Sequence, residues 1–153
     1  MLPLHNKNLG MFIQSIIKRI PTGLFTAIVA GLIAYLSLDG DPFDANRVKL
    51  FEGADKVIHA IMYFTLVSVL LFDTAKRMFP KNISTLVVVL CAAFAFAYSV
   101  LMEYLQGAMG LGRSASVYDA VANLVGVLAG CAVMKCWFLG YVENILRSKN
   151  VKK

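Results

Sequence analysis

The amino-acid sequence predicts an all-α, polytopic membrane protein with four transmembrane helices in an antiparallel bundle and both termini in the cytoplasm. Hydrophobic residues make up 59% of its 153 residues and charged residues only 16%, whereas soluble domains average about 45–50% and about 25%. Apolar runs of about 17 to 23 residues are too long for one small core and long enough to cross roughly 30 Å of bilayer hydrocarbon. Basic residues flank these runs, as is typical of membrane proteins.

Four apolar runs are predicted to be membrane-spanning helices: residues 22–38, 57–72, 84–105 and 117–134. Each crosses the hydrocarbon at about 1.5 Å per helical residue, and the second is marginal in length. Pro21 precedes the first run, and Pro42 and Pro80 fall in connections, where proline disturbs a helix least. The proline positions therefore agree with the boundaries that hydropathy predicts.

The flanking segments complete the predicted organisation. Residues 1–19 form a basic cytoplasmic N-terminal segment, residues 20–139 the four-helix domain, and residues 140–153 a basic cytoplasmic tail. Apolar residues between positions 9 and 20 recur near helical spacing. This spacing is typical of an interfacial helix, and a partly ordered tail is the alternative.

Positive charges divide unevenly between the two sides that four spans create. Eleven of the 15 Lys and Arg residues lie on the side of both termini, whereas most acidic residues lie in or beside the connections 39–56 and 107–116. Because cytoplasmic segments hold most of the Lys and Arg, both termini are predicted inside and these connections outside. The formal net charge of +6 forms no single patch, which predicts membrane lipids as partners and no nucleic acid.

Polar side chains collect at three ends of the predicted helices. Asp55, His59 and Tyr63 recur every four residues at the start of the second span, and Lys56 lies beside them. Other polar residues, spaced so that each pair shares one helix face, end the third span and begin the fourth: Glu103 with Gln106, and Asp119 with Asn123.

Because successive spans alternate in direction, these three ends lie at the same outer membrane face. The sequence therefore predicts one polar pocket, built from Asp55, His59, Glu103, Gln106, Arg113, Asp119 and Asn123. Ala122, Gly126 and Gly130 form a small-xxx-small ladder that lets another helix approach the fourth span closely.

A structural interpretation of the same residues stays open. His59 and Asn123 can act as bridges between helices, and Asp119 can cap a helix N-terminus. Glu103 and Arg113 can form an ion pair that ties a loop to a helix. A functional pocket is favoured because seven polar groups from three spans exceed what four helices need for adhesion.

Several short motifs follow one another along the chain: Tyr35-Leu-Ser-Leu38, Asp55-Lys56-x-x-His59-x-x-x-Tyr63, Glu103-x-x-Gln106, Gly112-Arg113-Ser114 and Asp119-x-x-x-Asn123-x-x-Gly126-x-x-x-Gly130. In this order, over residues 32–131, they resemble the VanZ-like family of small bacterial membrane proteins. Such proteins often carry a proline after the Ser-Leu of the first motif, where this chain has Asp39-Gly-Asp-Pro42. The departure concerns only the shape of the first outer connection.

The resemblance implies a multi-pass protein of the bacterial plasma membrane with a role in the cell envelope. The founding member is associated with resistance to the glycopeptide antibiotic teicoplanin, and the family has no settled reaction. The family residues that carry over are Asp55, Lys56, His59, Glu103, Gln106, Arg113, Asp119 and Asn123.

The predicted function is binding or modification of a cell-envelope component, such as a lipid-linked cell-wall precursor, at the outer face. His59, Asp55 and Glu103 are the candidate catalytic residues, with His59 as general acid or base and Asp55 fixing its tautomer. The candidate ligand-binding residues are Lys56, Tyr63, Gln106, Arg113, Asp119 and Asn123. Arg113 suits a phosphate or carboxylate, whereas carboxylate and amide side chains suit hydroxyl groups.

Neither a cofactor nor a metal site is predicted. The three cysteines are odd in number, lie in apolar runs and lack metal-ligand spacing, and His59 is the only histidine within the spans. A divalent ion held by Glu103 and Asp119 is a weaker interpretation. Two other functions stay open: a small-solute or proton transporter, for which the sequence offers only Thr65 and Ser68 as inner polar groups, and a structural or accessory membrane protein.

Overall fold

The computed structural model describes residues 19–39, 53–78, 81–109 and 116–138. These residues form helices α2 (Leu24–Leu38), α3 (Ala54–Met78), α4 (Thr85–Met109) and α5 (Val117–Val133), followed by the π-helical turn η1 (Met134–Phe138). The all-α prediction with four main helices is confirmed for this part of the chain. The predicted interfacial helix and basic tail fall on segments outside the described residues.

Three helical segments are long and apolar enough to cross a bilayer: Ala54–Met78, Thr85–Met109 and Val117–Cys136. Helix α2 is apolar but has only 15 residues, a length of about 22 Å at 1.5 Å per residue. It begins two residues later than predicted because Gly23, with φ of 90°, breaks the helical path just before it.

Helix α3 is longer than the apolar run 57–72 that predicted it. It begins at Ala54, directly after Gly53 with φ of 85°, and ends at Met78, a length of 25 residues. Its first turn carries Asp55, and its last turn carries Lys76 and Arg77, which stabilise the two ends of the helix dipole. Hydropathy missed these turns because they are polar.

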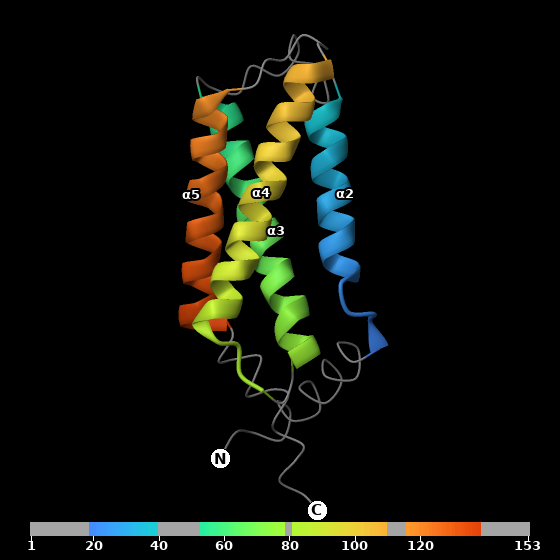
Figure 1. Ribbon diagram of the computed structural model, residues 1–153, viewed down its shortest axis with the longest axis vertical. Helices are drawn as coiled ribbons and strands as arrows, with labels where there is room; N and C mark the ends of the chain where they lie inside the picture. The colour runs from blue at the N-terminus through green and yellow to red at the C-terminus, as the bar shows by residue number, and fades with distance from the viewer. Residues whose placement is uncertain (1–18, 40–52, 79–80, 110–115, 139–153) are drawn as a thin grey trace, which may run out of the picture.

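The helix ends are distributed between two levels along the long axis (Figure 1). The start of α3, the end of α4 and the start of α5 lie at the upper end, whereas α2 starts and α3 ends at the lower end. Between these ends lies a fully buried apolar layer: Leu66, Val67, Leu71, Ala95 and Val127. The outward faces of the helices carry large apolar residues such as Leu86, Phe94 and Leu128, each more than half exposed. Such faces suit contact with lipid.

Helices α3 and α5 pack at backbone distance, as the glycine ladder predicted. A Cβ atom added at Gly126 would lie 2.1 Å from the carbonyl oxygen of Ala60, and one at Gly130 would lie 2.9 Å from the carbonyl oxygen of Phe64. The two glycines therefore remove the side chains that would separate the helices. This contact brings the starts of α3 and α5 together at the upper end.

Helix α2 is tied to the others by polar contacts at its lower end. The backbone N–H and the hydroxyl of Thr26 both donate to Asp73 Oδ2, at 3.1 and 2.8 Å, and Lys76 Nζ donates to the carbonyl of Ile20. Higher up, the Tyr98 hydroxyl donates to the carbonyl of Ala30 at 2.8 Å. Asp73 thus accepts a hydrogen bond from an N–H group in the first turn of α2, which has no acceptor within its own helix.

Thr26→Val is expected to lower the free energy of unfolding by about 1–2 kcal/mol, because it removes a hydrogen bond to a carboxylate between two helices. Thr65→Val is the matched control, since the Thr65 hydroxyl donates to the carbonyl of Ile61 in its own helix. This variant should change stability by less than about 0.5 kcal/mol. Thermal unfolding in detergent micelles measures both. Equal losses for the two variants would contradict the assigned role of Asp73.

Candidate functional site

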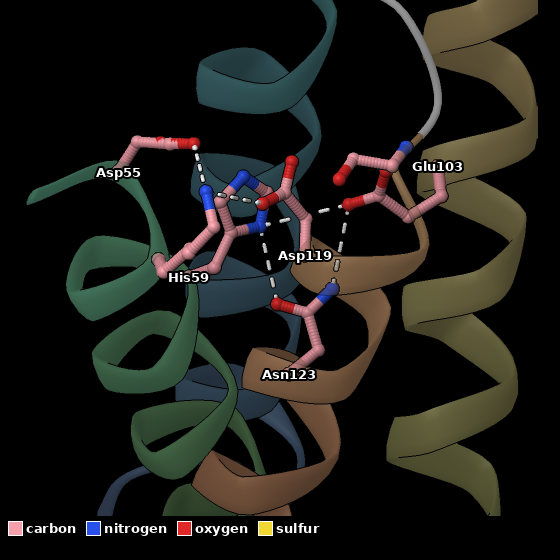
Figure 2. A network of polar contacts seen from close by, with 7 residues as sticks. Asp55, His59, Glu103, Asp119 and Asn123 are labelled. Carbon is pink, nitrogen blue, oxygen red and sulfur yellow. Dashed lines mark hydrogen bonds and ion pairs between the residues drawn. The ribbon is translucent and has the colours of Figure 1, made fainter. Parts of the chain in front are cut away.

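Four polar side chains from three helices meet at the upper end of the molecule (Figure 2). They are His59 of α3, Glu103 of α4, and Asp119 and Asn123 of α5. All are buried, with exposed fractions of 5%, 7%, 9% and 0% in the same order. We call these four residues the outer cluster, after the membrane face that the sequence predicts for them.

Asn123 stands at the centre of the outer cluster and connects two helices to α5. Its Nδ2 donates to Glu103 Oε1 at 3.5 Å, and its Oδ1 lies 3.1 Å from His59 Nδ1. Because an amide oxygen only accepts, His59 Nδ1 is the donor in this contact. In the neutral ring Nε2 then holds the free lone pair, which can accept a proton or coordinate a ligand.

Glu103 has several contacts, and all of them are long. Oε1 lies 3.7 Å from His59 Nδ1 in addition to the Asn123 contact, and the backbone N–H of Ser116 donates to Oε2 at 3.4 Å. Hydrogen bonds to a carboxylate are normally about 2.7–2.9 Å long. The negative charge of Glu103 is therefore weakly compensated by the described part of the protein.

Asp119 lies one helical turn before Asn123, and its carboxylate points toward the His59 ring. Its Oδ1 has no hydrogen-bond partner among the described residues, and it forms a long ion pair with Lys56 Nζ at 3.8 Å. Lys56 also pairs with Asp55 Oδ2 at 3.6 Å. The side chains of Lys56 and Asp55 are about half exposed, so they form the rim above the buried carboxylates.

The other predicted site residues have different places. Tyr63 is buried one turn below His59, and its hydroxyl has no partner among the described residues. Gln106 is buried on the Glu103 side of α4. Asp55 contacts Lys56. The contact that orients the His59 ring, which the sequence predicted for Asp55, is made by Asn123. Arg113 lies outside the described residues.

Residues 9–139 match the family model described as VanZ/LLP1. The chain belongs to the VanZ/LLP1 family. No curated protein and no solved structure matches it. The match covers α2 to α5 and confirms the family resemblance that the motifs indicate. All four residues of the outer cluster lie within the VanZ/LLP1 region.

The sequence analysis missed a third buried carboxylate in this VanZ/LLP1 protein, besides Glu103 and Asp119. Asp73 is only 3% exposed, and its Oδ1 has no hydrogen-bond partner among the described residues. It borders a pocket at the lower end, lined by Thr22, Gly23, Thr26, Leu70, Asp73, Thr74 and Arg77. Asp73 lies seven residues after Leu66, a spacing that puts both on the same face of a helix and could have indicated that Asp73 is buried. The sequence analysis ended this span at Phe72 and therefore assigned Asp73 to the connection after it.

The outer cluster and Asp73 belong to separate polar regions. Three turns of α3 separate Tyr63 from Asp73, and the buried side chains in those turns are Leu66, Val67 and Leu71. Ser99 of α4, whose hydroxyl also lacks a described partner, lies one turn deeper than Glu103. Among the described residues that are fully buried, those between the two regions are apolar apart from Ser99.

Proposed function

We propose that this VanZ/LLP1 protein crosses the bacterial plasma membrane as an antiparallel four-helix bundle with both termini in the cytoplasm. The excess of Lys and Arg on the side of the termini supports this orientation. The outer cluster then lies near the outer headgroups, and α2 crosses as a short helix tied to its neighbours by Asp73 and Tyr98.

At this face the protein binds or modifies a cell-envelope component that carries phosphate or carboxylate together with hydroxyl or amide groups, such as a lipid-linked cell-wall precursor. The observation that carries the proposal is the convergence of buried His59, Glu103 and Asp119, where Glu103 has only long hydrogen bonds and Asp119 Oδ1 has none among the described residues. Arg113, which lies in the segment joining α4 to α5, supplies a planar cation for the anionic group. An envelope component of this kind connects the protein to glycopeptide antibiotic susceptibility.

His59 supplies the proton chemistry in this proposal. With Nδ1 donating to Asn123, Nε2 can take a proton from a hydroxyl of the bound component or return one to it. Carboxylate oxygens of Glu103 and Asp119 accept hydrogen bonds from its hydroxyl or amide groups. Exposed Lys56 at the rim attracts the negative charge.

A purely structural network fits the outer cluster less well, because a packing network gains stability only when its buried atoms are satisfied. A transporter requires polar side chains that connect both ends of the bundle. The apolar layer of Leu66, Val67 and Leu71 separates the two polar regions and argues against that alternative.

The proposal predicts that an envelope lipid with an anionic headgroup copurifies with the protein. Mass spectrometry of lipids extracted from detergent-purified protein should show one such species enriched over its share of the membrane. His59→Asn should reduce the enrichment by at least about 10-fold, because it removes one hydrogen bond to a charged group of the lipid. Lys135→Gln is the control. Lys135 lies in η1 and donates to the Thr85 hydroxyl at the start of α4, far from the outer cluster, so its replacement should leave the enrichment unchanged. Identical lipid profiles for the wild type, His59→Asn and the bulk membrane would contradict the proposal.

A further inference from the structure

Three potential metal ligands lie close together in the outer cluster. One ring nitrogen of His59 and one carboxylate oxygen each from Glu103 and Asp119 all lie within 4.8 Å of one another. The three residues come from three different helices, and their side chains are only 6%, 9% and 13% exposed in the same order. Their spacing is therefore set by the packing of α3, α4 and α5.

The charges of this group call for a cation. The hydrogen bonds of Glu103 are 3.4 and 3.5 Å long, and Asp119 Oδ1 has no hydrogen-bond partner among the described residues. Lys56 stays 3.8 Å from Asp119 with about half of its side chain exposed, so it can turn out into solvent at little cost. A buried carboxylate pair without strong donors needs a proton or a bound cation.

The donor types select the class of cation. Mg²⁺ and Ca²⁺ prefer oxygen ligands alone, whereas imidazole with carboxylates suits Zn²⁺ and similar transition metals. Tetrahedral Zn²⁺ with bonds of about 2.1 Å requires ligand atoms about 3.4 Å apart. The ligand atoms now lie up to 4.8 Å apart. Side-chain rotations that bring them about 1.4 Å closer would reach the tetrahedral spacing.

The residue behind the ligands also fits this assignment. Asn123 contacts both His59 and Glu103, and residues that orient metal ligands in this way tune metal affinity. We propose that His59, Glu103 and Asp119 bind a divalent transition-metal ion, with Zn²⁺ as the best fit. Three protein ligands leave one position open for a phosphate or carboxylate oxygen of the bound component. This inference rests on the proposed function for the access of that component to the cluster.

The test is metal binding by the full chain in detergent, measured without any lipid ligand. Protein stripped with a chelator should bind one equivalent of Zn²⁺, and Co²⁺ in its place should give a visible absorption band that Mg²⁺ does not remove. Asp119→Asn should weaken Zn²⁺ binding by at least about 10-fold, and Lys56→Gln, which removes the competing cation, should strengthen it. Asp39→Asn, a carboxylate at the end of α2 outside the cluster, should leave it unchanged.

Two results would overturn the inference: no Zn²⁺ bound by stripped wild-type protein, or equal affinity in the wild type, Asp119→Asn and Lys56→Gln. The Lys56→Gln arm keeps the test decisive if Asp119→Asn fails to fold, because a structural role for Lys56 predicts no gain in affinity. Enrichment of an anionic lipid without Zn²⁺ binding would contradict the metal site and support the proposed function. Zn²⁺ binding without lipid enrichment would support the metal site and contradict the proposed function.

Discussion

Gly126→Ala is expected to lower the free energy of unfolding by about 3 kcal/mol, at the upper end of the usual cost of overpacking. The new Cβ would lie 2.1 Å from the carbonyl oxygen of Ala60 and 2.9 Å from its carbonyl carbon. These are backbone atoms of α3, which no side-chain rotation can move. Helices α3 and α5 must therefore separate, and thermal unfolding and folded yield in detergent measure the loss.

Gly31→Ala is the matched control for this prediction. Gly31 lies within α2, and a Cβ atom there would meet nothing within 4 Å. Alanine is favoured over glycine inside a helix by about 0.5–1 kcal/mol, so this variant should be as stable as the wild type or more stable. A loss of stability similar to that of Gly126→Ala would show that the close contact between α3 and α5 is not what Gly126 provides.

The sequence predicted the parts of the fold that depend on local patterns. Hydropathy located four helices, and the spacing of Gly126 and Gly130 indicated the close packing of α5. The polar residues His59, Glu103 and Asn123 meet because each lies near the end of an apolar run and the runs alternate in direction. Periodicity and chain connectivity together were enough to bring these residues to one end.

Other features depend on contacts between helices, which one sequence does not contain. Asp73 was assigned to a connection because hydropathy ends a span at the first charged residue, yet Thr26 on a different helix donates two hydrogen bonds to its Oδ2. The partner of His59 is similar. Asp55 lies one turn away on the same helix, but Asn123 of α5 reaches the ring because the glycine ladder brings α5 close. Tertiary packing decides between a local and a distant partner.

Glu103→Gln is expected to reduce lipid enrichment and Zn²⁺ affinity by at least about 10-fold while folded yield and thermal stability stay near wild type. The reason lies in the hydrogen bonds of Glu103, whose lengths of 3.4 and 3.5 Å give little stabilisation to offset the cost of burying its charge. Neutralising a weakly compensated buried charge is often neutral or stabilising. The amide keeps the shape of the carboxylate but removes its charge and one acceptor.

Asp73→Asn is expected to give the opposite result, because Asp73 is the buried carboxylate outside the outer cluster. Its Oδ2 accepts two hydrogen bonds, at 2.8 and 3.1 Å, which join α2 to α3. Loss of the charge should cost about 1–2 kcal/mol of stability and leave lipid enrichment and Zn²⁺ affinity unchanged. The two variants thus separate a carboxylate that holds helices together from one that meets a ligand. If Glu103→Gln instead loses stability as Asp73→Asn does and keeps its lipid and Zn²⁺, the outer cluster is a packing network.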